Sequence, residues 1–444
     1  MSVMRDLTMP HLCLVALSGV RVVSPRLRAL GLTMPSLRKR AEALAALPAL
    51  GLLTLAGMTP EPWTCSYVEA PSSSDSLVQD IVSRAPTLVA VSALTASIEQ
   101  AYALCALLRA QGLRTVIGGL HVTSCPDEAE RHSDAVVIGE GEPVWHEVLA
   151  DAQAQRLKPR YGPSAPFDLA RSPLPRLDLL GPGARRRFTL QTERGCPLAC
   201  EFCGASRLLG PFREKPLDLI ERELDVICTR TARPVIELAD DNTFAGGRDR
   251  WDLLDALGKR GVRWFTEADW RIGEDQDTVK KLADAGCVQI LMGVESPFIA
   301  PTGMGPKRAD VNLVLDSIEE IQDAGVSVNA CFIAGMDGET PQSLEKLTRF
   351  ILACPAADVQ VTLQTPFPGT PLRRRLEREH RLLARSWDSY TLFDVTFVPS
   401  AMSPRELEQG FEGLVESVYS PDALERRAQI RKQTNRFSEL QTWE

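Results

Sequence analysis

The first third of the chain alternates short apolar runs with amphipathic segments. Apolar runs predict strands at residues 12–18, 65–70, 88–92, 115–119 and 135–141. Between the third and fourth runs, apolar residues from Ile98 to Leu108 recur at helical spacing, and Gly112 is a stop signal. This alternation predicts an α/β fold with a parallel, doubly wound, Rossmann-like sheet. Ligands of such sheets bind beyond the carboxyl ends of the strands.

The same alternation returns after residue 186. Strands are predicted at residues 188–194, 235–240, 262–269, 288–295, 326–335 and 359–367. Helices are predicted at residues 216–230, 250–260, 276–285, 309–324 and 341–353. Six strands with a helix between most neighbours predict a partial (β/α)6 barrel of the TIM type, with its chemistry at the C-terminal strand ends.

These patterns predict four parts of the chain. Residues 1–150 form the Rossmann-like domain and residues 186–385 form the partial barrel. Residues 151–185 between them are rich in Pro, Gly and Arg without a period, which predicts a linker. Residues 386–444 form a C-terminal helical extension, which begins with an aromatic patch.

Composition narrows the function classes. The chain has 444 residues, with 50 Lys and Arg against 58 Asp and Glu, and a net charge of −8. Without a sustained basic run, we expect no nucleic-acid partner. The most apolar segment, residues 47–58, is too short to span a bilayer, so we expect no membrane partner and a cytoplasmic protein. Eleven cysteines in such a chain point to metal binding or catalysis rather than to a disulfide framework.

Three of these cysteines, Cys196, Cys200 and Cys203, lie in a loop broken by Gly and Pro. Structural zinc needs four ligands, and all five histidines lie far away in the sequence. A redox Cys-x2-Cys pair leaves Cys196 unexplained, and three unrelated buried thiols are a further alternative. A four-iron cluster held by three thiolates explains the missing fourth ligand, because one iron stays open for a substrate or cofactor.

Cys-x3-Cys-x2-Cys, with Phe202 before the last cysteine and just after the first barrel strand, resembles the motif of the radical S-adenosylmethionine (SAM) superfamily. The resemblance implies a [4Fe-4S] cluster bound by Cys196, Cys200 and Cys203, whose open iron is chelated by SAM. It also implies reductive cleavage of SAM, a 5′-deoxyadenosyl radical that abstracts a substrate hydrogen atom, and an electron donor of the flavodoxin or ferredoxin type.

Polar residues at later strand ends extend this resemblance. They are Asp240, Asp241, Asp269, Arg271, Glu295 and Ser296 as cofactor-binding candidates, and Glu267 as a catalytic candidate. The segment 292–296 resembles the family's G-x-E-S segment, and residues 332–340 and 365–372 resemble its later strand ends. Tyr390 and Asp394 are further catalytic candidates, on a segment expected to close the barrel.

Residues 47–63 and 116–145 resemble the N-terminal domain of radical SAM enzymes that bind cobalamin. The resemblance implies a cobalamin site at Gly118, Gly119, Glu140 and Gly141. The Asp-x-His-x-x-Gly signature of methionine-synthase-like domains is absent, and we do not assign His121 as a cobalt ligand. The alternative is a Rossmann-like scaffold without a ligand.

The ligand of this domain decides the expected reaction. With cobalamin, the resemblance implies methyl transfer to an unactivated carbon of a small molecule, which we expect to belong to secondary metabolism, such as antibiotic biosynthesis. Without cobalamin, it implies a radical dehydratase or epimerase acting on an aminoglycoside or similar polyol. A non-catalytic iron–sulfur sensor is a third alternative.

Overall fold

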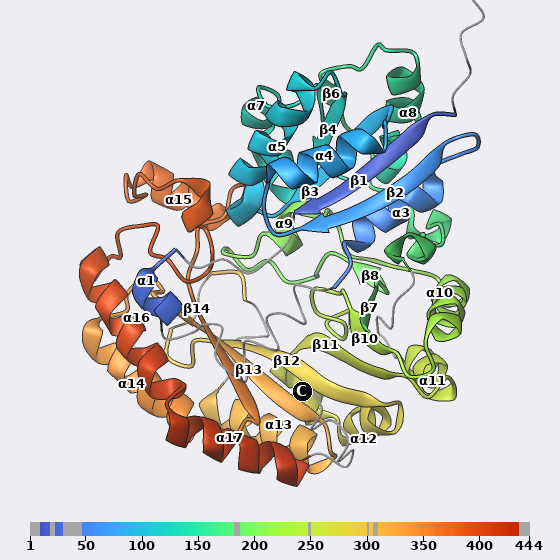
Figure 1. Ribbon diagram of the computed structural model, residues 1–444. Coiled ribbons are helices and arrows are strands. Elements are labelled where there is room, and N and C mark those ends of the chain that lie inside the picture. Colours follow the sequence, from blue (N-terminus) through green and yellow to red (C-terminus); the bar gives the residue numbers. More distant parts are fainter. Residues whose placement is uncertain are drawn as a thin grey trace, which may run out of the picture. The chain divides into compact units, whose positions relative to one another are not determined.

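The computed structural model describes residues 9–17, 23–29, 47–181, 187–246, 250–299, 302–304 and 310–434 (Figure 1). The chain divides into two compact units. The first consists of residues 1–19 and 48–183, and the second of residues 20–47 and 184–444.

The first unit is built on a six-stranded parallel sheet of order β2-β1-β3-β4-β5-β6. Its strands are β1 (His11–Leu17), β2 (Thr64–Ala70), β3 (Leu88–Ala93), β4 (Thr115–Gly118), β5 (Ala135–Val137) and β6 (Arg160–Tyr161). Its helices are α3 (Leu50–Met58), α4 (Asp75–Ser83), α5 (Ile98–Ala110), α6 (Leu120–Ser124), α7 (Pro126–Ala129) and α8 (Trp145–Gln153).

Helices cover both faces of this sheet, which explains its continuous apolar strands. Six of the seven residues of β1 are buried. Leu12, Leu14 and Ala16 belong to one core cluster with residues of α3 and α8. Because successive side chains of a strand alternate, the remaining residues of β1 face the opposite side, where α4 and α5 lie (Figure 1). The doubly wound sheet expected from the sequence is confirmed.

The segment expected to be a linker differs from that expectation. Residues 160–161 add the edge strand β6, and Tyr161, Phe167, Leu169 and Leu177 are buried. The segment also packs on α3, where a side chain at Gly57 would meet the Leu174 carbonyl at 2.2 Å. Apolar anchors spaced without a period therefore hold this stretch on the first unit, and helix or strand periodicity does not detect them.

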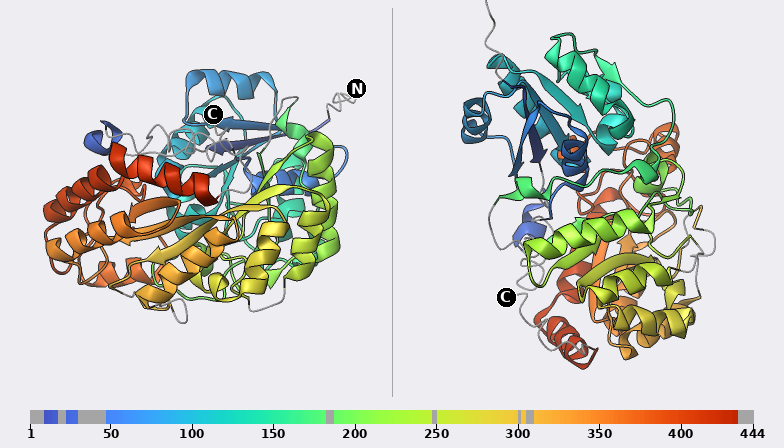
Figure 2. Two further views of the ribbon diagram at one scale, coloured as in Figure 1. Left: turned by 90° about the horizontal axis from the view of Figure 1, so that it is seen from below. Right: turned by 90° about the vertical axis from the view of Figure 1, so that its right-hand side faces the viewer.

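The second unit contains a six-stranded sheet in sequential order, β14-β13-β12-β11-β10-β7. Its strands are β7 (Arg187–Leu190), β10 (Val235–Leu238), β11 (Arg263–Asp269), β12 (Cys287–Glu295), β13 (Ser327–Ala334) and β14 (Asp358–Leu363). Its helices α10 (Leu217–Arg230), α11 (Trp251–Lys259), α12 (Gln276–Asp284), α13 (Val311–Asp323) and α14 (Pro341–Ala353) line the outer side of the strands (Figures 1 and 2). All five strand pairs are parallel, which confirms the partial barrel.

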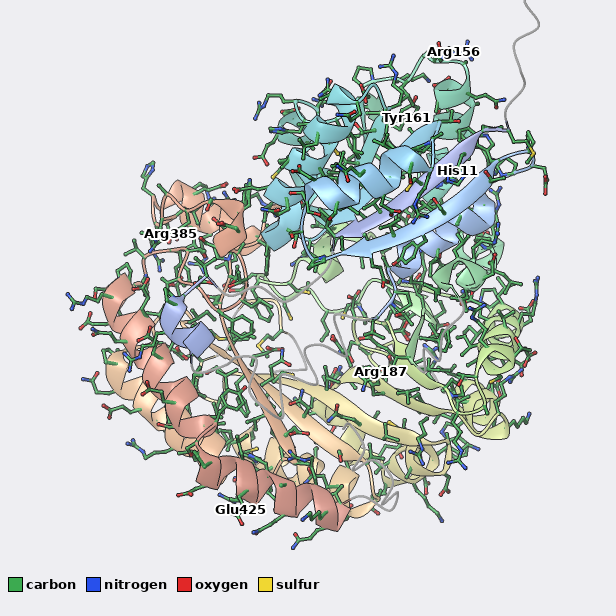
Figure 3. All side chains as sticks on the ribbon, viewed as in Figure 1. His11, Arg156, Tyr161, Arg187, Arg385 and Glu425 are labelled. Carbon is green, nitrogen blue, oxygen red and sulfur yellow. The ribbon has the colours of Figure 1, made fainter. Side chains whose placement is uncertain are left out.

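Smaller elements complete the second unit. They are α1 (Pro25–Ala29), β8 (Glu193–Arg194), α9 (Ala205–Leu208), β9 (Arg213–Glu214), α15 (Pro371–Arg378), α16 (Pro404–Val418) and α17 (Pro421–Thr434). Arg427 of α17 is buried and donates to the carbonyls of Ile351, Cys354 and Ala356 at the end of α14. Glu425 lies exposed on the same helix (Figure 3). The expected helical extension thus packs on the barrel helices.

Within the described ranges, no helix is both long enough and apolar enough to cross a membrane.

Candidate active site

The cysteine loop follows the first barrel strand. After β7, the short strand β8 pairs with β9 and the chain reverses at Gly195, whose φ is +81°. A side chain there would lie 3.0 Å from the Gly210 carbonyl, so the close approach requires glycine. Cys200 is 6% exposed, whereas Cys196 and Cys203 are half-buried.

Backbone hydrogen bonds hold this loop from two distant segments. The N–H groups of Ala199 and Glu201 donate to the carbonyls of Gly303 and Thr302, at 3.2 and 3.0 Å. The N–H of Leu372 donates to the Glu201 carbonyl at 3.0 Å. Gly303 has φ +86°, and a side chain there would meet the Ala199 carbonyl at 2.0 Å. The position of the loop therefore depends on a close backbone contact.

The donor set of this loop fits a cluster bound by three thiolates. Three sulfur donors lie within eight consecutive residues, and two of them are partly accessible. Among the described residues, no three His, Cys, Asp or Glu side chains are grouped to hold a single metal ion. The pKa of Arg271 is raised, first by its hydrogen bond to Asp269 and further by the charge of Cys196. A nearby guanidinium favours the thiolate form that metal binding needs.

Asp240, just after the end of β10, is surrounded by donors from the protein itself. It is 3% exposed, and its carboxylate accepts hydrogen bonds from the N–H groups of Thr192 and Glu193 at 2.8 and 3.1 Å. The hydroxyls of Thr192 and Thr243 also donate to it, at 2.5 and 3.2 Å. Burial raises the pKa of Asp240, and the bonds from Thr192 and Glu193 oppose that shift. The side chain fixes the start of the cysteine loop, and protein donors occupy the oxygens expected to bind the SAM ammonium.

Asp241 is the better placed of the two adjacent aspartates. It is half-buried, and the N–H of Gly195, next to Cys196, hydrogen-bonds to it. Burial and the charge of Asp240 raise its pKa to about 6, and the Gly195 bond opposes the shift. Asp241 therefore stays a cofactor-binding candidate.

Asp269 and Arg271 form a pair at the end of β11. Asp269 is 4% exposed and accepts from Arg271 Nε at 2.8 Å and Nη2 at 2.6 Å. Burial raises the pKa of Asp269, but the bonds from Arg271 and Asn242 outweigh it, so the net pKa lies below its usual range. The pair lines a cavity of 510 Å³ with Asn242, Arg250 and Trp251. The structure thus places two predicted residues at one cavity, where they form an ion pair with each other.

Three further candidates lie at the same strand ends. Glu267 is exposed on β11, and its carbonyl accepts from the N–H of Thr243 at 3.1 Å. Glu295 closes β12 with φ +63° where the register with β13 shifts, and its side chain is 7% exposed. Ser296 Oγ accepts from the N–H groups of Phe298 and Ile299, so it caps the following turn. A strained residue at a strand end is typical of a functional position, which keeps Glu295 a candidate.

Both catalytic candidates of the tail have partners within the second unit. Asp394 accepts from the N–H groups of Val23 and Ser24 at 3.1 and 2.9 Å and from the Thr391 hydroxyl at 2.6 Å, so it anchors the segment before α1. The Tyr390 hydroxyl is bonded to Arg373 Nη1 at 3.0 Å, and the residue is 3% exposed. These contacts give Asp394 a structural role, and they bury Tyr390 against α15.

In the first unit, the predicted cofactor residues gather at the ends of β4 and β5. Gly119 has φ +118° and precedes α6. Side chains at Gly118 and Gly119 would make only ordinary contacts, the nearest at 3.5 and 3.6 Å. The Thr123 hydroxyl bridges the two strand ends, donating to the Gly119 carbonyl and accepting from the Gly139 N–H, both at 2.9 Å. Two consecutive positions at this edge carry no side chain, which suits the close approach of a large planar ligand.

Glu140 and Gly141 lie at the end of β5. The Glu140 carboxylate accepts from the N–H of Phe167 at 2.6 Å, which ties residues 160–181 to the sheet edge. A side chain at Gly141 would meet Leu55 of α3 at 3.3 Å, so the position favours a small residue. His121 is 1% exposed, with ring nitrogens 3.4 Å from Thr95 Oγ1 and from Glu128 Oε1. It is part of the core of the first unit.

Three parts of the chain match known family models. Residues 190–351 match the family model of the radical SAM superfamily. These residues form a domain of this superfamily. Residues 40–149 match the B12 binding domain, and residues 370–442 match a domain of unknown function, DUF4070. The resemblance stated from the motifs is confirmed, and this radical SAM chain is an enzyme of that class.

Similar proteins extend over both units. The chain is 26% identical to a bacteriochlorophyllide d C-12(1)-methyltransferase of Chlorobaculum tepidum over 392 residues, which cover 86% of this chain and 84% of that protein. It shares its fold with the cobalamin-dependent SAM radical enzyme OxsB at 15% identity and TM-score 0.68, covering 90% of this chain and 66% of OxsB. It also shares its fold with the radical SAM methyltransferase TsrM of Kitasatospora setae at 14% identity and TM-score 0.67, covering 94% of this chain and 90% of TsrM.

The cofactor expectations follow this membership. The radical SAM domain brings a [4Fe-4S] cluster and SAM, and the B12 binding domain brings cobalamin. These expectations are confirmed at the level of the family, and the alternative of a sensor without catalysis gains no support. The individual ligand residues stay predictions.

The sequence did not reveal a buried ion pair beside the loop. Glu193 is 1% exposed, and its Oε2 lies 2.5 Å from Arg250 Nη1. Burial and the charge of Asp240 raise the pKa of Glu193 to about 9, and Arg250 opposes the shift. Arg250 also donates to Thr192 Oγ1 at 2.8 Å and lines the 510 Å³ cavity. In the sequence, the signal of this ion pair is a charged residue three positions before Cys196.

Proposed function

We propose that the chain is a cobalamin-dependent radical SAM methyltransferase that methylates a carbon atom of a small molecule. One observation carries the proposal: a B12 binding domain and the three-cysteine loop of a radical SAM barrel occur in one chain. A radical dehydratase needs no cobalamin, and no feature of the described residues favours it. We further propose a substrate from secondary metabolism, a flavodoxin or ferredoxin as electron donor, and a cytoplasmic location.

The names of the similar proteins support methyl transfer. One is a bacteriochlorophyllide methyltransferase, TsrM is a methyltransferase solved with cobalamin and a [4Fe-4S] cluster, and OxsB was solved with aqua-cobalamin and SAM. When bound, the cluster and SAM supply radical chemistry, and cobalamin supplies a methyl carrier.

The chain's own residues would bind and orient these groups. Cys196, Cys200 and Cys203 would hold the cluster, and the positive charge of Arg271 would favour the thiolate form of Cys196. Asp241, half-buried beside Gly195, would accept hydrogen bonds from the ammonium group of SAM. The glycine edge at Gly118 and Gly119 would admit the corrin ligand to the backbone. Exclusion of water from this region would protect reactive species.

The test is anaerobic purification after growth with hydroxocobalamin, followed by iron and cobalt analysis and an ultraviolet–visible spectrum. We expect about four irons per chain and cobalt in proportion to the protein. Iron without cobalt would contradict methyl transfer and favour the dehydratase or epimerase reaction. A protein with neither iron nor cobalt would contradict both the methyltransferase and the dehydratase or epimerase reaction.

Cysteine variants test the ligand set in the same preparation. Cys200→Ala should abolish cluster binding, because a cluster held by two thiolates is not retained. Cys228→Ala, outside the loop, is the matched control and should retain the iron of the parent protein. Full iron in Cys200→Ala would show that the cluster is held elsewhere.

A further inference from the structure

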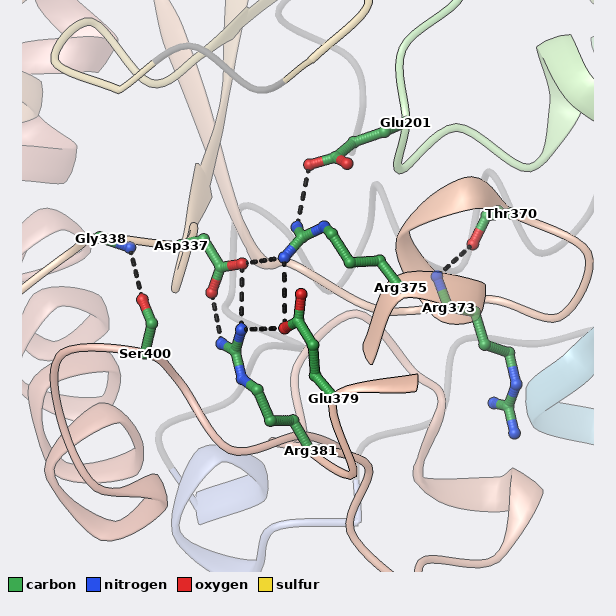
Figure 4. A network of polar contacts seen from close by, with 9 residues as sticks. All are labelled: Glu201, Asp337, Gly338, Thr370, Arg373, Arg375, Glu379, Arg381 and Ser400. Carbon is green, nitrogen blue, oxygen red and sulfur yellow. Dashed lines mark hydrogen bonds and ion pairs between the residues drawn. The ribbon is translucent and has the colours of Figure 1, made fainter. Parts of the chain in front are cut away.

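A network of charged side chains joins the cysteine loop to α15 and the residues just after it, which follow the last barrel strand. Arg375 Nη2 of α15 lies 3.1 Å from Oε1 of Glu201, which stands between Cys200 and Cys203. The other end of the Arg375 guanidinium donates to Asp337, in the turn after β13 (Figure 4). Arg381 binds the same Asp337 and lies 2.7 Å from Glu379 Oε2. One guanidinium thus bridges the cysteine motif and a barrel turn.

The network is shielded enough for its geometry to matter. The side chain of Glu201 is 15% exposed, that of Asp337 25% and that of Arg375 26%. Burial raises the pKa of Asp337, but the bonds from Arg381 and Arg375 outweigh it and hold the pKa below its usual value. The Arg375 guanidinium uses one nitrogen for each carboxylate, and its planar fork fixes the direction of both contacts better than a lysine ammonium could.

Backbone and apolar contacts run beside the ion pairs. Leu372 N–H donates to the Glu201 carbonyl at 3.0 Å. Phe202 packs against the cluster of Leu372, Leu376 and Phe397. The DUF4070 match begins at residue 370, so this segment opens with the residues that grip the cysteine loop.

We propose that Arg375 is a positioning residue for the iron–sulfur site. Through Glu201 it fixes the backbone that carries Cys200 and Cys203, and it neutralises the carboxylate that lies between these two cysteines. The proposal rests on the proposed role of the three cysteines as cluster ligands. Negative charge beside a cluster disfavours the addition of an electron, so the bridge also raises the reduction potential.

Hydrogen exchange of the protein without cluster tests the mechanical role. In Arg375→Gln, we expect the amides of Ala199 and Glu201 to exchange about tenfold faster, because the loop loses a charged partner. Arg378→Gln is the matched control, since Arg378 is exposed on the same helix. Peptides from β12 and β13 should exchange as in the parent protein. Equal loop exchange in the two variants would overturn the mechanical role.

The reduction potential of the reconstituted cluster tests the charge role. Arg375→Gln should lower the potential, Glu201→Gln should raise it, and the double variant should lie between them. Arg375→Lys keeps the charge without the fork, so its potential should stay near the parent value while its loop exchange remains fast. Potentials that shift in the same direction in Arg375→Gln and Glu201→Gln would overturn the charge role, because mere loosening affects both alike.

The cysteine variants separate this proposal from the one on which it rests. If Cys200→Ala keeps its iron, the ligand assignment fails, whatever Arg375 does. If Cys200→Ala loses its iron while Arg375→Gln matches Arg378→Gln in exchange and in potential, the positioning role alone fails.

Discussion

The strand ends of the two sheets are built from opposite materials. In the first unit they carry Gly118, Gly119 and Gly139, and Glu140 is a carboxylate bonded to the Phe167 N–H. In the second unit they carry carboxylates such as Asp240 and Asp269, each bonded to nearby donors. Both units have parallel sheets, so sheet type does not explain the different residues at their strand ends. We attribute the difference to the different ligands proposed for the two edges.

This difference shows how a polar strand end should be interpreted. A buried carboxylate must be hydrogen-bonded, and the cheapest donors are the N–H groups of the loop that follows a strand. Asp240 meets that need within the protein, so it organises a loop before it can bind a ligand. A glycine has no side chain that requires hydrogen-bond donors, so a strand end made of glycines leaves room for a ligand.

The largest effect is expected from Asp240→Asn, at a strand end of the second unit. The amide nitrogen would face donors from Thr192, Glu193 or Thr243. We expect a loss of about 3 kcal/mol in the free energy of unfolding, measured by chemical denaturation. Asp241→Asn is the matched control: its stability should change little, while its affinity for SAM should fall. Equal stability loss in both variants would contradict the division of roles.

A smaller effect is expected from Gly119→Ala in the first unit. The φ of +118° and ψ of −178° at Gly119 are strained for alanine, which should cost about 2 kcal/mol and lower the cobalt content. Gly118→Ala lacks a positive φ and should retain both stability and cobalt. A cobalt loss shared by both variants would point to space rather than backbone conformation as the limiting feature.

The smallest effect concerns pH and Glu339, a buried carboxylate after β13. Its carboxylate accepts from the Gly335 N–H at 2.7 Å, while burial raises its pKa to about 7. The folded pKa exceeds the unfolded value of about 4.3, so the folded state binds more protons between these values. Stability from this group is therefore lost as pH rises through that window and is constant above it.

Glu339→Gln should remove this slope. Relative to the parent protein, the variant should gain about 1 kcal/mol between pH 5.5 and 6.5, measured by unfolding of the protein without cluster. Exposed Glu345→Gln on α14 is the control and should follow the parent. A parallel pH profile in parent and Glu339→Gln would show that Glu339 ionises in the same range in both states.

The elements were predictable because their apolar runs have clear periods. Strand and helix positions such as 263–269 and 341–353 lie within a residue or so of the expected ones. The three-cysteine motif was predictable because its spacing is contiguous in sequence. The strand β6 was not predictable, because two residues are too few to show a period. The ion pair between Glu201 and Arg375 was not predictable either, because the two residues are 174 positions apart.

Long separation in the sequence also hides which carboxylates are already bonded to protein donors. Asp240 meets Thr192, and Asp394 meets Val23, so their partners are invisible from neighbouring residues. Side-chain type predicts that a residue will be hydrogen-bonded, but only the fold decides whether the donor is protein or ligand.

The contacts of the cysteine loop also impose an order of assembly. The strands of the barrel sheet are neighbours in sequence order, so most of the barrel can form as the chain emerges from the ribosome. The loop leaves the ribosome near the beginning of that process, yet its backbone partners, Thr302, Gly303 and Leu372, are synthesised much later. The three thiols therefore wait, exposed to oxidants and stray metals, until the last strand is in place. Delivery of iron and sulfide is thus expected to be a late event, after translation of the barrel.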